Sequence, residues 1–243
     1  MGEIEMIRKA IAVVAAALIA SGSAFAGGDV SGKISWDGKA PGRKALKMQA
    51  DPVCASKHTD KVLSDKVVVN ENSTMMNVFV YVSKGLEDQK FDIPAEPAVL
   101  DQKGCLYSPK ILGVMAGQKI NILNNDGTLH NVHPKPKVNT EVNIAMPKFM
   151  KKKVVTLDKP EVMIPVRCDV HPWMSGHIGV LSHPFHSVSD GMGGFSLNGV
   201  PAGSYTVTAW HEVFGSKSME VTVADGGSVA ADFSYSMADF KKN

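Results

Sequence analysis

Residues 164–180 read IPVRCDVHPWMSGHIGV, with a strand-like start, a polar and proline-containing middle and a second strand-like end. The apolar start delivers Cys168, a tight loop follows, and the next strand is expected to begin at His177. His171 and Met174 stand in the loop, with two residues between successive donors. One short loop can therefore present a thiol, an imidazole and a thioether to a single point.

These donors indicate a metal site. A copper ion that changes between Cu(I) and Cu(II) suits a soft thiolate, two imidazoles and a weak axial thioether, the ligand set of blue-copper centres. The second imidazole is offered by residues 117–132, GQKINILNNDGTLHNV, in which a glycine turn, an alternating strand and an asparagine-rich bend lead to His130. His133 is the alternative donor, but it directly precedes Pro134, where a turn residue is expected.

Together the two runs resemble the signature of the cupredoxins, in the plastocyanin and amicyanin branch, and the Cys-x2-His-x2-Met spacing is that of amicyanin. The resemblance covers residues 97–182 and implies a Greek-key β-sandwich that holds one type 1 copper ion. It also implies that His130, Cys168 and His171 are the strong equatorial ligands and that Met174 is the long axial ligand.

The same resemblance assigns roles to neighbours of the ligands. Asn131 is expected to tie the two ligand loops together, and such outer contacts orient ligands and tune the metal. In cupredoxins the loop histidine reaches the surface through an apolar patch. The likeness therefore implies that His171, with Pro172 and Trp173, forms the port through which electrons pass.

The first residues predict export. Arg8 and Lys9 precede an apolar run, and Ala24-Phe25-Ala26 offers small residues at a cleavage point, so residues 1–26 are expected to be a secretory signal peptide. The run is shorter than the roughly 20 apolar residues that a membrane-spanning helix needs, and no membrane span is expected elsewhere. The protein is therefore predicted to be periplasmic or otherwise exported, which excludes nucleic acid as a partner.

Three cysteines in an oxidising compartment leave one that needs an explanation. Metal ligation explains Cys168, and Cys54 and Cys105 are then free to form a disulfide that closes a long loop. An alternative is that Cys54 and His58 begin a second metal site.

The pattern of the whole chain is all-β. Short runs of β-branched and apolar residues alternate with Gly, Pro, Asn and Asp, at the spacing of turns in a sandwich. No long segment keeps a helical period, and a short helix is expected only near residues 52–58 or within residues 141–151.

Residues 183–243 form a second block, which resembles the carboxypeptidase regulatory-like (transthyretin-like) β-sandwich. The likeness depends on a Pro-x-Gly turn in Val200-Pro201-Ala202-Gly203, between strands whose inward residues are expected to be Phe195, Leu197, Tyr205 and Val207. Residues 27–96 contain VSGKISWDGKAP, which is similar to the opening of that family. Either the two segments form one discontinuous sandwich with the copper domain inserted, or the domains follow in tandem.

The remaining histidines, tryptophan and methionines have structural interpretations. His177 is expected to point away from the metal, and Trp210 to lie in the core. Surface or strand-end positions are expected for His183, His186 and His211, and packing roles for Met146 and Met150.

The formal net charge of +2 identifies no partner. Lysines gather locally in residues 135–159, which contain Lys135, Lys137, Lys148, Lys151, Lys152, Lys153 and Lys159. They are either a solvated face with a protected edge strand or a surface that steers an acidic redox partner, such as a c-type cytochrome.

The donor set favours a one-electron carrier between redox proteins, and no enzyme activity is expected. The chain has neither the His-x-His pairs of multicopper oxidases nor a Cys-x-x-Cys-His haem motif. The alternatives are a copper protein for storage, delivery or sensing, and a structural protein that binds a surface.

Overall fold

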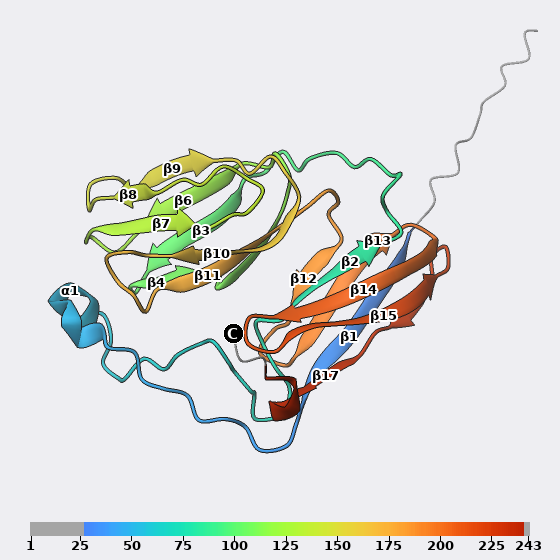
Figure 1. Ribbon diagram of the computed structural model, residues 1–243, viewed down its shortest axis with the longest axis horizontal. Helices are drawn as coiled ribbons and strands as arrows, with labels where there is room; N and C mark the ends of the chain where they lie inside the picture. Colours follow the sequence, from blue (N-terminus) through green and yellow to red (C-terminus); the bar gives the residue numbers. More distant parts are fainter. Residues whose placement is uncertain (1–26, 241–243) are drawn as a thin grey trace, which may run out of the picture.

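The computed structural model describes residues 27–240, so the expected signal peptide lies outside the described residues (Figure 1). The described chain is almost entirely β-structure, as the sequence predicts, and it forms two sandwiches. No helix in this part of the chain is long and apolar enough to cross a membrane. We name residues 97–182 the inserted sandwich, and the flanking residues 27–96 and 183–240 the outer sandwich.

The outer sandwich combines strands from both sides of the insert. Its first strand, β1 (Gly28–Asp37), pairs with β13, β16 and β17 near the end of the chain, and β2 (Phe79–Lys84) pairs with β12 and β14. One discontinuous sandwich therefore carries the insert. The bounds of its later strands are β12 His186–Val188, β13 Gly194–Val200, β14 Gly203–His211, β15 Gly215–Val223, β16 Ser228–Ala230 and β17 Phe233–Ser236, and a 3-10 turn follows at Met237–Asp239.

The core of the outer sandwich follows from strand alternation. Residues on β13 and β14 that were expected to face inward are buried, and the Pro201-containing turn joins these two strands. Proline fixes one backbone angle of the turn, and Gly203 follows where the chain approaches the Tyr205 ring too closely for a Cβ. The confirmed inward residues are Phe195, Leu197, Tyr205 and Val207.

The inserted sandwich has one sheet in the order β5-β11-β10-β7-β8 and a facing sheet in the order β4-β3-β6-β9. Because β7 and β10 pair antiparallel, the first residue of β7, His130, lies at the same end as Cys168, which follows β10. The bounds are β3 Ala98–Lys103, β4 Leu106–Ser108, β5 Ile111–Met115, β6 Ile120–Asn124, β7 His130–Pro134, β8 Ile144–Met146, β9 Lys152–Val155, β10 Glu161–Arg167 and β11 Ser175–Leu181.

The two sandwiches contact each other through a small apolar cluster of Phe79, Ile111, Met163 and Leu181. The sheets approach closely at two glycines of the inserted sandwich. A Cβ added at Gly179 would lie 2.7 Å from the Phe79 ring, and one at Gly113 would lie 2.3 Å from the His186 ring. Glycine is therefore required at both positions for the observed packing.

Trp210 lies at this interface and is only partly buried, so its expected place in a core is wrong. Its ring packs against the ring of His177, with 4.9 Å between centroids. His177 thus faces the outer sandwich and not the Cys168 loop, as predicted. The tryptophan bridges two domains because its strand, β14, belongs to the sheet that faces the insert.

Two of the remaining histidines are not on the surface. His183 is buried, and His211, although it ends β14 as expected, is 1% exposed and stacks on Phe214. The Nδ1 atom of His211 accepts a hydrogen bond from the backbone N–H of Val213. The Nδ1 of His183 likewise accepts from the backbone N–H of Phe185, so one hydrogen bond to each ring offsets part of the cost of burying these neutral imidazoles.

Acidification is expected to destabilise the protein through the buried His211 and the partly buried His186. Burial lowers the pKa of His186 and of His211 to about 4 in each case. In the unfolded chain both rings bind protons near their ordinary pKa of about 6.5, so stability is lost as the pH falls from that value toward the folded pKa. Thermal melts at stepwise lower pH should show this loss. His186→Gln should flatten the dependence, and an unchanged slope in that variant would contradict the assignment.

The long connection between β1 and β2 crosses to the inserted sandwich, where it forms a short helix, α1 (Pro52–Ala55), after a 3-10 turn at Met48–Ala50 (Figure 1). Asp51 caps α1, because its Oδ1 accepts hydrogen bonds from the backbone N–H groups of Val53 and Cys54. The other expected helix position, within residues 141–151, contains the strand β8 instead. That segment pairs with β7, which favours an extended backbone.

Candidate metal centre

Three of the predicted ligands converge at one buried point. The Nδ1 atoms of His130 and His171 lie 2.9 Å apart, and the Cys168 Sγ lies 3.9 Å from the Nδ1 of His171. Their possible ligand atoms all lie within 4.8 Å of one another. The start of β7 supplies the imidazole of His130, and the loop after β10 supplies the thiol of Cys168 and the imidazole of His171. Segments far apart in the sequence therefore present three donors to a shared centre.

Met174, the predicted axial ligand, is fully buried in the core of the inserted sandwich, in the cluster that contains Cys168. The backbone closes the loop around it. The N–H of Met174 donates to the carbonyl of His171 at 2.9 Å, and the N–H of Cys168 donates to the carbonyl of Met174 at 3.2 Å. The loop is thus a compact turn whose methionine points inward.

The Cys168 thiol is prepared to lose its proton. Burial alone raises its pKa, but contact with the His130 ring and hydrogen bonds from backbone N–H groups outweigh burial and lower the pKa to about 7. Two of these donors, the N–H groups of Asn131 and His171, each lie 3.4 Å from the sulfur. The thiolate is the form that binds metals, so the backbone favours a metal ligand here.

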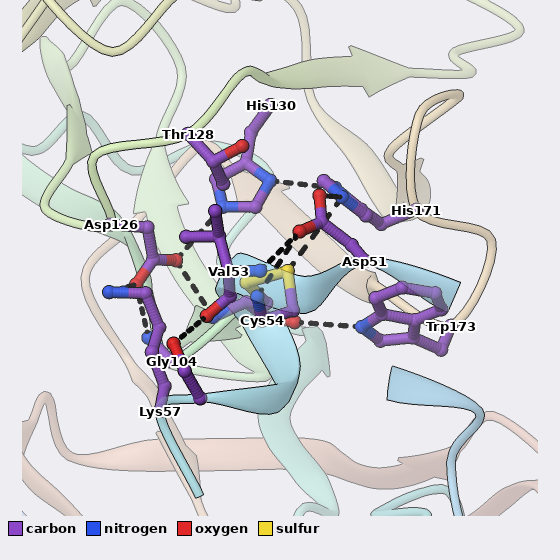
Figure 2. The surroundings of a disulfide bond; sticks show 12 residues. Asp51, Val53, Cys54, Lys57, Gly104, Asp126, Thr128, His130, His171 and Trp173 are labelled. Atoms are coloured by element: carbon purple, nitrogen blue, oxygen red, sulfur yellow. Dashed lines mark hydrogen bonds and ion pairs between the residues drawn. A yellow bond between two sulfur atoms is a disulfide. The ribbon is translucent and has the colours of Figure 1, made fainter. Parts of the chain in front are cut away.

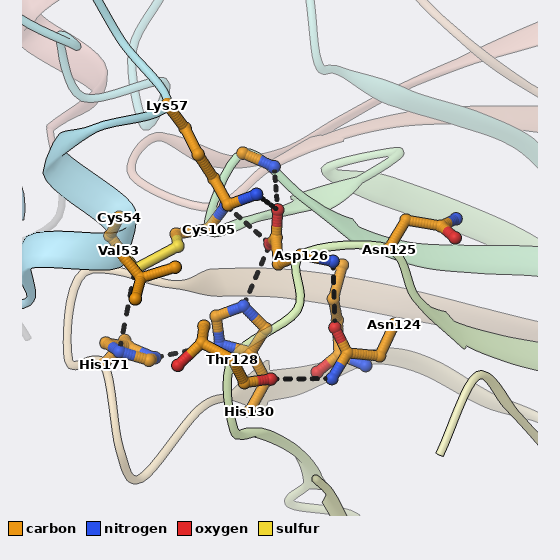
Figure 3. Close-up of polar contacts among 12 residues, drawn as sticks. Val53, Cys54, Lys57, Cys105, Asn124, Asn125, Asp126, Thr128, His130 and His171 are labelled. Carbon is orange, nitrogen blue, oxygen red and sulfur yellow. Dashed lines mark hydrogen bonds and ion pairs between the residues drawn. A yellow bond between two sulfur atoms is a disulfide. The ribbon is translucent and has the colours of Figure 1, made fainter. Parts of the chain in front are cut away.

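A carboxylate holds the far nitrogen of each histidine (Figures 2 and 3). The Nε2 of His130 lies 2.9 Å from Asp126 Oδ2, and the Nε2 of His171 lies 2.9 Å from Asp51 Oδ2. Carboxylates accept hydrogen bonds, so the imidazole protons are placed on Nε2 and both Nδ1 lone pairs face the centre. A single proton on one ring lets the two Nδ1 atoms share a hydrogen bond at 2.9 Å, and a metal ion bound by both atoms would replace that proton.

The local charges favour a positive charge at the centre. Burial opposes charge on the His130 ring, but contact with Asp126 and Cys168 outweighs burial and raises its pKa. Burial also opposes charge on Asp126, but hydrogen bonds from His130, from the Cys105 backbone and from Lys57 lower the pKa of that carboxyl group. The site therefore balances buried negative groups against positive ones, and a bound metal ion would add to that balance.

Asn131 bridges the two segments that carry the ligands. Its Oδ1 accepts a hydrogen bond from the N–H of Asp169 at 2.6 Å, and its Nδ2 donates to the Asp169 carboxylate at 3.1 Å and to Asn143 Oδ1 at 2.6 Å. Asp169 directly follows Cys168. The side chain of Asn131 thereby fixes the start of the ligand loop against β7.

His133, the alternative donor, faces away from the centre. It lies in β7 and not in the expected turn, and carboxylates bind both of its ring nitrogens. The Nδ1 lies 2.6 Å from Asp169 Oδ2 and the Nε2 lies 2.8 Å from Glu141 Oε1. Along a strand, side chains separated by an odd number of residues point to opposite faces, so His130 and His133 cannot both face the site.

The structure differs from the cupredoxin likeness at the expected electron port. Pro172 is exposed and Trp173 is half-buried, but His171 is only 2% exposed and does not reach the surface. Asp51 and Cys54 cover it, with the Cys54 Sγ 3.7 Å from its Nε2. The prediction that His171 opens to solvent is wrong, because a segment from outside the inserted sandwich lies over the ring.

Cys54 and Cys105 form a disulfide, with 5.6 Å between their Cα atoms (Figure 2). Cys54 is therefore not a free thiol that could begin a second metal site with His58. The Nε2 of His58 instead contacts the carbonyl of Gly104 at 2.8 Å. Both contacts attach α1 to the inserted sandwich.

The donor set fits copper. A thiol with a lowered pKa, two Nδ1 atoms with their lone pairs turned inward and a buried thioether on the same loop provide the soft and borderline ligands that type 1 copper requires. Sequence reasoning named all four of these residues as candidate ligands. It missed Asp126, which stands four residues before His130, and Asp51, for which no local sequence pattern exists.

Neither a protein-family model nor a curated protein matches the chain. Among solved structures, a mutant amicyanin in the Cu(I) form is 20% identical, with a TM-score of 0.31, over 42% of this chain and 97% of that chain. The purple cupredoxin of Nitrosopumilus maritimus is 18% identical, with a TM-score of 0.29, over 34% of this chain and 98% of that chain.

The copper-containing nitrite reductase of Thermus scotoductus is 20% identical, with a TM-score of 0.31, over 42% of this chain but only 26% of that chain. These neighbours are cupredoxins or contain a comparable part. Their likeness concerns the fold alone, and the metal centre is inferred from the contacts described above.

Proposed function

We propose that this chain is an exported type 1 copper protein that carries single electrons between redox partners. The convergence of His130, Cys168 and His171 on one buried point supports this proposal most directly. Copper, when bound, supplies a one-electron couple at that point. The protein contributes rigidity: Asp126, Asp51 and Asn131 hold the ligands by hydrogen bonds, so their positions need not change with oxidation state.

The surroundings support a carrier more than an enzyme. All three clustered donors are buried, and the arrangement leaves no open side on which a substrate could approach. Trp173 packs 4.9 Å from the His171 ring and lines a shallow apolar depression with Pro172 and Leu46. We place the electron port at Trp173 in this depression, because His171 itself is covered.

The proposed partner is an acidic redox protein, such as a c-type cytochrome, in the periplasm or another exported compartment. Exposed lysines lie on and next to the edge strand β9, and oppositely charged surfaces accelerate encounter. They are Lys148, Lys151, Lys152 and Lys153. We assign the outer sandwich to the carboxypeptidase regulatory-like family on its turn and strand pattern, in an accessory role.

A visible absorption spectrum of the protein loaded with Cu(II) tests the proposal. Wild type should show an intense thiolate-to-copper band that reductant bleaches, and Cys168→Ser should lose it because the band requires the sulfur ligand. His133→Gln is the matched control and should keep the band, since His133 faces away from the donors.

Storage or delivery of copper is the second candidate, and the covered position of His171 favours it, because a sealed ligand suits retention of the metal. A colourless protein that binds Cu(I) tightly would support this candidate and contradict the electron carrier. A protein that binds no copper in either oxidation state would contradict both and leave a structural, surface-binding role.

A further inference from the structure

The segment that covers His171 comes from outside the inserted sandwich. We name residues 48–58 the cap; they contain α1 and belong to the connection between β1 and β2 of the outer sandwich. Asp51 and Cys54 of the cap both contact the Nε2 of His171, at 2.9 Å and 3.7 Å (Figure 2). The outer sandwich thus supplies the part that closes the metal domain.

Three further contacts hold the cap against the inserted sandwich. The Cys54–Cys105 disulfide is the covalent one, and the Lys57 Nζ lies 3.2 Å from Asp126 Oδ1 (Figure 3). In the third, the Nε2 of His58 contacts the carbonyl of Gly104. Asp126 also accepts hydrogen bonds from the backbone N–H groups of Gly104 and Cys105, at 2.6 Å and 2.7 Å. Because the same carboxylate holds His130, the cap is attached to the frame that positions the other imidazole.

Asp51 uses its two oxygens for two different tasks. Oδ1 accepts from the N–H groups at the start of α1, and Oδ2 accepts from the Nε2 of His171. The capping hydrogen bonds fix the rotamer of the Asp51 side chain. In that rotamer, Oδ2 already points at the imidazole of His171. Asp126 plays the corresponding part for His130, so each imidazole has its own carboxylate.

We propose that Asp51 is a positioning residue of the metal centre: it holds the Nε2–H of His171 so that Nδ1 stays turned toward the donors, and the cap closes the centre against outside ligands. The proposal rests on the copper centre proposed above but not on electron transfer. Copper should therefore be retained by a second domain as well as by the ligand loop.

Two variants separate the tasks of Asp51. Asp51→Asn can still cap α1 with its one carbonyl oxygen, but then its NH2 group faces the Nε2–H of His171, and neither group can accept. Asp51→Ser can also cap the helix, but its side chain is too short to reach His171. Asp60→Asn is the matched control. It removes the same charge as Asp51→Asn, but Asp60 is exposed and makes no contact with His171.

The first measurement is the rate at which a Cu(I) chelator removes copper from the reduced protein. Both Asp51 variants should lose the metal roughly 10- to 100-fold faster than wild type, as removal of outer hydrogen bonds to ligands commonly weakens metal binding by that factor. The reduction potential should also rise in Asp51→Asn, because the anionic partner of His171 favours Cu(II). Asp60→Asn should match wild type in both measurements. Wild-type rates and potentials in the Asp51 variants would overturn the proposal.

The second measurement needs no metal. Cys168 is the one free cysteine among the described residues, and it is buried. Alkylation by iodoacetamide, followed by mass spectrometry, should be faster in metal-free Asp51→Ser than in wild type, and unchanged in Asp60→Asn. Equal rates in all three proteins would show that Asp51 does not hold the cap closed. If wild type binds no copper, the proposed function fails, while this comparison still decides whether Asp51 closes the site.

Discussion

Replacing both Cys54 and Cys105 by alanine is expected to lower the free energy of unfolding by about 4 kcal/mol. The disulfide joins residues 51 positions apart, and cross-linking a loop of that length removes much of the conformational entropy of the unfolded chain. Both sulfurs are fully buried, so alanine is a better replacement than serine, which would bury two hydroxyl groups. Urea denaturation measures the difference.

The same double variant should also open the cap, since only Lys57 and His58 would then connect it to the loops at residues 104 and 126. Val53→Ser is a suitable control: it alters the exposed face of α1 and leaves the disulfide intact. A double variant that is as stable as wild type would show that the unfolded chain gains little freedom from losing the cross-link. A loss in Val53→Ser as large as in the double variant would assign the effect to the helix.

The candidate ligands could be named from the sequence because they stand in local patterns. Cys168, His171 and Met174 stand in one loop, and His130 follows a recognisable pattern of a glycine turn, an alternating strand and an asparagine-rich bend. Strand alternation likewise predicted the buried residues of β13 and β14, because a period of two places every second side chain on the same face. Local patterns of this kind do not depend on how distant segments meet.

The cover over the centre could not be predicted, because it depends on a contact between residues 120 positions apart. Asp51 is one aspartate before a short helix, and nothing in its neighbours indicates that its second oxygen meets His171. The likeness to cupredoxins placed His171 at the surface, and this was wrong for the same reason: in this chain a second domain supplies the segment that buries it. Trp210 was misplaced because an interface between domains resembles a core in sequence.

The junction of the two sandwiches also contains a buried charge that sequence patterns do not reveal. Lys110 precedes β5 of the inserted sandwich, and its side chain is only 5% exposed. Its Nζ lies 3.1 Å from Glu212 of the outer sandwich, 3.2 Å from Asp65 of the β1–β2 connection and 3.0 Å from the carbonyl of Ser175. One ammonium group therefore links three separate parts of the chain.

Lys110→Met is expected to lower the free energy of unfolding by about 3–5 kcal/mol near neutral pH, the usual loss when one partner of a buried ion pair is removed. Methionine keeps most of the side-chain volume, so the loss comes from leaving Glu212 charged and unpaired. Lys66→Met is the matched control, because Lys66 is exposed and acts on Glu212 only through its charge at a distance, so its replacement should change stability by no more than about 0.5 kcal/mol.

The pH dependence of this loss separates charge from packing. Burial raises the pKa of Glu212, and Lys110 partly opposes that shift, so Lys110→Met should raise the pKa further. A carboxyl group whose folded pKa lies above its unfolded pKa destabilises the fold as the pH rises through the folded value, and protonation relieves the cost as the pH falls. The deficit between variant and wild type should therefore shrink as the pH falls toward the ordinary pKa of a glutamate. Taking the difference at each pH removes the effect of the buried histidines, which both proteins share.

Adding Glu212→Gln to Lys110→Met should recover part of the loss at neutral pH, because a neutral pair no longer buries an uncompensated charge. A packing defect would behave differently: the deficit would persist at low pH, and the second substitution would add to it. No recovery at neutral pH, without any further loss, would mean that Glu212 is already neutral in the folded protein. In that case Asp65, the more exposed of the two carboxylates, would be the partner that carries the charge.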